Sequence, residues 1–164
     1  MKIYLSSYWK RSCWFSTIMI VLILLFTVLF CIWSHDDEDY ILIVGAVLFV
    51  LLFCYLTGIS MRLVRYVRKE NQQLVMYSLC GRKLSSLSLE TDIYYEILPL
   101  IEGTCSKRDF IILSNEPFMS YQTNRFSGLA KICKSIDTTG NQVIMPYGTP
   151  ILSNLNISAW HKID

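Results

Sequence analysis

The residues best suited to nucleophilic catalysis are six cysteines and two histidines, spread over the whole 164-residue chain. A cysteine becomes a catalytic nucleophile when a base such as histidine lies beside it. Only His161, near the C-terminus, can share a compartment with Cys80, Cys105 or Cys133, because His35 lies between two long apolar runs. No CxxC pair is present, so we expect reduced, structural thiols at all six positions, which are Cys13, Cys31, Cys54, Cys80, Cys105 and Cys133.

Carboxylates are the other candidates for chemistry. Residues 35–39 read His-Asp-Asp-Glu-Asp and offer oxygen ligands to a divalent cation, but they lack the spacing and the glycine of a calcium loop. On a strand, Glu90, Asp92 and Glu96 would share one face, as a paired-carboxylate site requires. Solvated carboxylates are the favoured explanation of both patterns, and the glycines form no phosphate-binding loop. We therefore predict a non-enzymatic protein with no catalytic residue, metal site or cofactor.

Two uncharged apolar runs, residues 13–33 and 41–61, dominate the sequence. Each is about 31 Å long as a helix, which matches a hydrocarbon core of about 30 Å. Buried helices of a soluble protein rarely stay uncharged for this length, and the first run is too long for the apolar part of a cleaved signal peptide. The pattern predicts a transmembrane helical hairpin over residues 13–61, with the acidic loop between its helices.

The lysines and arginines near the hairpin indicate its orientation. Residues 1–12 carry Lys2, Lys10 and Arg11, whereas the loop between the runs carries no basic residue. Four more basic residues follow the second run, and they are Arg62, Arg65, Arg68 and Lys69. Basic flanks stay in the cytoplasm, so we predict a multi-pass protein of the cell membrane with both termini cytoplasmic. If the second helix continues through this segment, three of these residues form a stripe that could contact lipid headgroups.

The remaining residues, 71–164, alternate apolar and polar side chains between turn signals, which is typical of short strands. We expect strands over 74–80, 84–90, 92–101 and 110–114, with Pro99 either placing its strand at a sheet edge or ending it. Residues 129–136 fit a helix or a strand, residues 142–147 fit a strand, and residues 151–160 fit a short terminal helix that follows Pro150. The soluble part is near neutral, which argues against a nucleic-acid partner.

This order resembles the bacterial pleckstrin-homology-like domains fused to a two-helix membrane hairpin. The resemblance rests on the strand-turn-strand run from Leu74 to Glu90, the stretch from Lys107 to Leu113, and the turn before Gln142. It implies a bent antiparallel sheet closed by a C-terminal helix, and it carries over no functional residue. The expected fold is therefore a membrane α-hairpin followed by a small, mainly β, pleckstrin-homology-like cytoplasmic domain.

The chain then divides into a short N-terminus (1–12), the hairpin (13–61), a basic juxtamembrane segment (62–70) and a β-rich domain (71–164). We expect an interaction module that binds a protein or lipid at the cytoplasmic face of the membrane. Lys107, Arg108 and Arg125, with nearby aromatic residues, are candidates for its docking surface. The alternative is an accessory subunit of a larger membrane complex, bound through the hairpin itself. The sequence leaves the oligomeric state open.

Overall fold

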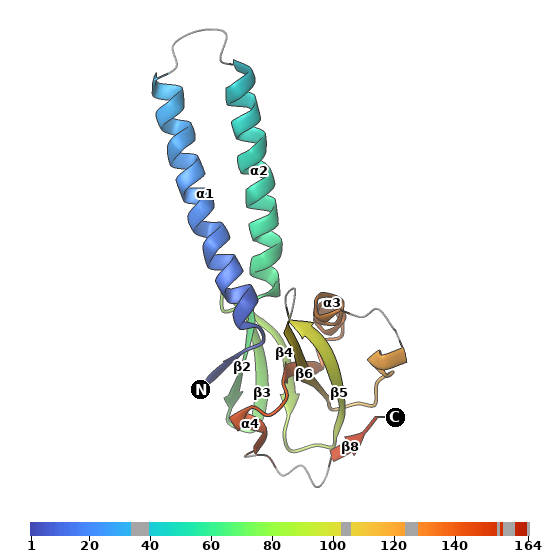
Figure 1. The fold of residues 1–164 in the computed structure, drawn as a ribbon. Coiled ribbons are helices and arrows are strands. Elements are labelled where there is room, and N and C mark those ends of the chain that lie inside the picture. The colour runs from blue at the N-terminus through green and yellow to red at the C-terminus, as the bar shows by residue number, and fades with distance from the viewer. Residues whose placement is uncertain (34–39, 103–105, 124–127, 154, 156–159, 164) are drawn as a thin grey trace.

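Two long helices extend from one end of a small domain that is built from two β-sheets (Figure 1). The computed structural model describes residues 1–33, 40–102, 106–123, 128–153, 155 and 160–163. The helices are α1 (Ser7–Trp33) and α2 (Tyr40–Leu63), which contain the two predicted apolar runs. Both are long and apolar enough to cross a membrane, and only 6 % of each span is buried against the rest of the protein. Helices of a soluble core would be mostly buried, so that alternative does not fit.

The first sheet joins the two ends of the helical hairpin. Its four strands are antiparallel and lie in the order β1 (Lys2–Tyr4), β2 (Arg65–Glu70), β3 (Gln73–Ser78) and β4 (Lys83–Ser88). The predicted strands at 74–80 and 84–90 are therefore confirmed, with small shifts at their ends. The sheet also includes β1, which precedes α1, and β2, which follows α2, so it begins before the boundary expected at residue 71.

The second sheet has the order β7 (Gln142–Pro146), β6 (Ser106–Ser114), β5 (Ile93–Glu102) and β8 (Trp160–Lys162). Its pairs are antiparallel except for β5 and β8, which run parallel. Strand β8 covers only Ile93–Tyr95 of β5, so Pro99 lies on the part of β5 beyond the reach of β8. The edge position predicted for Pro99 is confirmed, because a proline cannot donate a hydrogen bond to a further strand.

The helix α3 (Leu129–Thr139) settles the alternative that the sequence left open at residues 129–136. Its buried residues Leu129, Ile132, Cys133 and Ile136 have the spacing of one helical face. The helix ends at Gly140, whose positive φ of 69° lets its N–H bond to the Ile136 carbonyl. This face packs into the core between the sheets, where Phe110, Ile112 and Ile144 are fully buried.

The C-terminal region differs from the prediction. Instead of a helix over 151–160, the chain forms a single turn of helix, α4 (Pro150–Ser153), and Trp160 begins the strand β8. The Trp160 ring packs against Tyr95, with 6.1 Å between the ring centroids, and its strand pairs with β5. The helix start predicted at Pro150 is therefore confirmed, whereas at Trp160 strand pairing and aromatic packing replace the expected end of the helix.

Candidate functional site

The helical hairpin is joined to the domain by two very short connections. Leu5 and Ser6 link β1 to α1, and Val64 alone links α2 to β2. All three are buried. The Leu5 N–H donates to the Arg65 carbonyl, and the Leu79 N–H donates to the Val64 carbonyl, both at 2.9 Å. The base of the hairpin is therefore part of the sheet domain, and the domain cannot turn freely relative to the helices.

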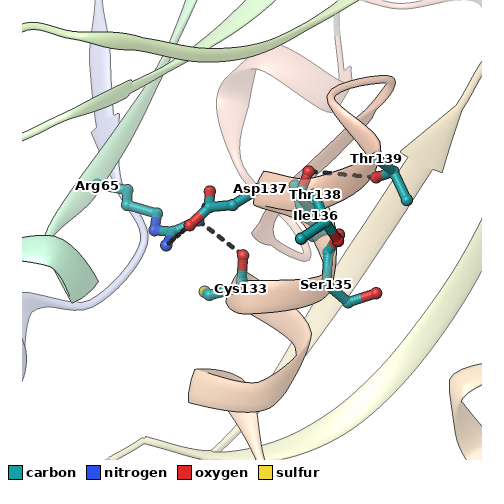
Figure 2. Close-up of polar contacts among 7 residues, drawn as sticks. All are labelled: Arg65, Cys133, Ser135, Ile136, Asp137, Thr138 and Thr139. Carbon is teal, nitrogen blue, oxygen red and sulfur yellow. Dashed lines mark hydrogen bonds and ion pairs between the residues drawn. The ribbon is translucent and has the colours of Figure 1, made fainter.

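Arg65 ties this base to α3 (Figure 2). Its guanidinium donates through Nη1 and Nη2 to the two carboxylate oxygens of Asp137, both at 2.7 Å. Nη1 also donates to the carbonyl of Cys133 at 3.0 Å. The Arg65 side chain is only 3 % exposed, whereas that of Asp137 is 36 % exposed. A bidentate pair of this kind fixes both partners, so α3 is held at the point where α2 meets the sheet.

The helix α2 does not continue through the segment 62–70, as a helical stripe of basic residues would require. The helix α2 ends at Leu63, and the alternation of β2 directs Arg65 and Val67 into the domain and Tyr66 and Arg68 to the opposite face. Arg62 is exposed at the end of α2, and Lys69 is exposed on β2. Arg68 is exposed and lies 3.7 Å from a carboxylate oxygen of Glu70. The structure therefore does not bring Arg62, Arg65, Arg68 and Lys69 together as one stripe.

The predicted docking residues lie at the start of β6. Lys107 and Arg108 are both exposed there. The ribbon shows that β5 ends and β6 begins at the end of the domain that carries the hairpin (Figure 1). Arg125 lies outside the residues that the structure describes.

A row of three tyrosine rings in contact runs across the first sheet, and the sequence pattern did not indicate it. Tyr4 on β1 lies 5.7 Å from Tyr66 on β2, and Tyr66 lies 5.4 Å from Tyr77 on β3, between ring centroids. Lys10 lies over the Tyr4 ring at 4.0 Å and Lys2 over the Tyr66 ring at 4.8 Å. The first two rings come together only because β1 pairs with β2. A strand of three residues before α1 has no recognisable pattern in the sequence, so this contact could not be predicted.

Among the described residues, His161 makes no contact with Cys80 or Cys133. Burial raises the pKa of Cys133 to about 12, so its thiol stays protonated and non-nucleophilic at neutral pH. His161 is exposed on β8, where its ring lies 5.2 Å from Tyr94 and its Nε2 lies 4.0 Å from a carboxylate oxygen of Asp92. His35 and Cys105 lie outside the described residues.

The three carboxylates considered for a paired site are also separate in role. Glu96 is buried and accepts hydrogen bonds from the backbone N–H groups of Tyr121 and Gln122 at 2.9 and 3.2 Å. It therefore fixes the segment that follows β6, while Glu90 and Asp92 are exposed. Among the described residues, no group of three histidine, cysteine or acidic side chains is placed to hold a metal ion. The acidic stretch 35–39 lies outside them.

Comparison with known proteins gives no relative: no family model, curated protein or solved structure matches the chain. The function therefore has to be argued from the geometry alone.

Proposed function

We propose that this chain is an integral protein of the cell membrane that presents a small, non-enzymatic interaction module at the cytoplasmic face. The observation that carries the proposal is the base of the hairpin, where Leu5, Ser6 and Val64 are buried in the domain. A module on a flexible tether would meet partners in any orientation. Here the same end of the domain always faces the bilayer, so its partners are those that can be met at the membrane surface.

The orientation in the proposal rests on two facts. Both chain ends belong to the sheet domain, through β1 and β8, so both lie on the same side of any membrane that the hairpin crosses (Figure 1). The basic residues that flank the apolar runs, such as Lys10 and Arg62, lie on that side as well. Basic flanks remain in the cytoplasm during insertion, which supports a cytoplasmic domain and cytoplasmic termini.

The proposed fold of the module is a pleckstrin-homology-like variant. Two small sheets enclosing one core support this at the level of layout. The position of the helix is different from the one that the resemblance implies, because α3 precedes β7 and the described chain ends in the strand β8. The function proposed for the module does not depend on this resemblance.

The test is photo-crosslinking of the full chain in native membranes. A photoreactive residue replaces Tyr77 on the domain in one variant and Leu25 on α1 in another, both at partly or fully exposed positions. The proposal expects crosslinks to a distinct partner from the domain position, and these should persist when the apolar stretches 15–29 and 44–56 are exchanged for unrelated ones. The buried base is left intact in this exchange, because it belongs to the fold of the domain. Crosslinks that come only from Leu25, or that disappear on the exchange, would instead support the accessory subunit.

A further inference from the structure

The strand directions divide the turns of the domain between two ends. Strand β2 starts at the hairpin and runs away from it, and the antiparallel β3 returns. The β3–β4 turn, residues 79–82, therefore lies at the hairpin end, whereas the β2–β3 turn lies at the far end. By the same alternation the end of β5 and the start of β6 lie at the hairpin end, as the ribbon shows (Figure 1).

The two ends differ in charge. The far end is balanced, with four acidic residues, Glu70, Glu90, Asp92 and Glu116, and four basic residues, Lys2, Arg68, Lys69 and Lys162. The hairpin end carries five exposed basic residues, which we name the basic end: Arg62, Arg82, Lys83, Lys107 and Arg108. Its nearby carboxylates are Glu102, Asp109 and Asp137, the last of which is paired with Arg65. The near-neutral composition of residues 70–164 does not reveal this local excess of basic residues.

The basic end lies within reach of lipid headgroups. The helix α2 ends two residues after its apolar run, and α1 starts six residues before its own, so at about 1.5 Å per residue the domain lies about 3–9 Å from the hydrocarbon. The headgroup layer of one leaflet is about 5–8 Å thick, and the screening length at physiological salt is about 8 Å. The end of the domain that carries the hairpin therefore lies within about one screening length of the headgroups.

We propose that the basic end binds the headgroups of anionic phospholipids in the leaflet beside it. Guanidinium and ammonium groups suit this ligand, because phosphate oxygens accept several of their hydrogen bonds at once. A role in fixing topology does not explain Lys107 and Arg108, since that rule counts residues within about 20 positions of a span and these lie more than 40 positions beyond Leu63. The inference rests on the proposed function, because lipid binding of this kind needs the domain at the cytoplasmic face. It deepens that function by naming anionic lipid as a ligand of the module.

The test uses the purified full chain in nanodiscs of phosphatidylcholine alone or mixed with phosphatidylserine. Hydrogen exchange of the backbone amides in residues 79–83 and 106–109 is followed by mass spectrometry. We expect these amides to exchange more slowly with phosphatidylserine, and high salt to remove the difference. In the variant with Arg82→Gln and Lys83→Gln the protection should fall about fivefold for each charge removed. The matched control, Lys69→Gln with Lys162→Gln, removes two charges at the far end and should keep the protection.

The outcomes separate this inference from the proposed function. Equal exchange in the two lipid mixtures, or a loss of protection that is the same in the control variant, would overturn lipid binding by the basic end. Amides of the buried strand β6 near Ile112 report whether each variant is folded, and Lys107→Gln alone provides a second variant at an exposed position. The nanodiscs contain no other protein, so a negative result here leaves the crosslinking test intact. A failure of that test would leave the phosphatidylserine dependence unchanged.

Discussion

At the scale of single residues, the pair formed by Arg65 and Asp137 is unequal in its surroundings. Arg65 is 3 % exposed and Asp137 is 36 % exposed. If Asp137 is removed, a buried guanidinium remains with the Cys133 carbonyl as its described acceptor, and its Nε has no hydrogen-bond partner among the described residues. If Arg65 is replaced by an apolar side chain, the remaining carboxylate can turn toward water. Removing Asp137 and replacing Arg65 should therefore lower the stability of the protein by different amounts, although both break the same ion pair.

We predict that Asp137→Ala destabilises the protein by about 3–5 kcal/mol, because it strands a buried charge. Arg65→Met should cost clearly less, since the exposed carboxylate is screened by solvent. The measurement is the midpoint of thermal unfolding of the full chain in detergent, and Lys131→Ala on the exposed face of α3 is the control. A larger loss for Arg65→Met than for Asp137→Ala would contradict this account of the pair.

The buried thiol of Cys133 predicts a pH dependence. Burial raises the pKa of this thiol in the folded protein to about 12, from an ordinary value of 9.0. The folded state thus favours the protonated thiol, and its contribution to stability is complete below pH 9.0 and is lost as the pH rises from there toward about 12. We expect Cys133→Ala to lose less stability than the wild type between these values. Cys80→Ala, at an exposed cysteine, is the control and should follow the wild type. The comparison is made by chemical unfolding at a series of pH values.

At the scale of elements, the sequence predicted the parts whose signal is local. The two apolar runs and the strands at 74–80, 84–90, 92–101 and 110–114 are where they were expected. Residues 65–70, by contrast, fit both a helix with a basic stripe and a strand with alternating faces. The strand forms because β1 and β3 pair with it on its two sides. Strand β1 has three residues, too few for any periodic signal, and β8 forms only because β5 offers it an edge.

The end of α3 gives a prediction about a single element. Gly140 has φ of 69°, which side chains with a Cβ rarely adopt, and a Cβ built there meets no atom within 4 Å. The penalty of Gly140→Ala is therefore conformational and should be about 1 kcal/mol. Gly128 precedes the same helix with φ of −73° and equally open space, so Gly128→Ala is the matched control and should be near neutral. The measurement is the thermal unfolding midpoint of each variant, and we expect a lower midpoint for Gly140→Ala than for Gly128→Ala. Equal midpoints would argue against the left-handed geometry at Gly140.

At the scale of the whole molecule, the candidate site is a product of topology. The residues of the basic end come from the end of α2, the β3–β4 turn, the start of β4 and the start of β6, and the first and last of them are 46 positions apart in sequence. The sequence pointed to Arg62 in one candidate set and to Lys107 with Arg108 in another, but it did not join the two sets, and it did not point to Arg82 and Lys83. Grouping them requires the direction of every strand relative to the hairpin, which depends on long-range pairing and has no local signal.

The pairing of β1 with β2 also predicts how the domain can be separated from the two helices. Tyr4 pairs with Tyr66, and the Leu5 N–H donates to the Arg65 carbonyl, so the hairpin helices leave and re-enter the sheet at adjacent points. A two-residue Asn-Gly turn can close such an antiparallel pair. We therefore expect a chain of residues 1–5, Asn-Gly and residues 65–164 to fold as a soluble domain. Residues 65–164 without β1 should unfold at a lower temperature, because they expose the edge of β2 and lose Ile3 and Leu5 from the core. Circular dichroism and thermal unfolding of the two chains test this. Equal stability would mean that β1 contributes nothing, and failure of both to fold would mean that the sheet depends on the helices themselves.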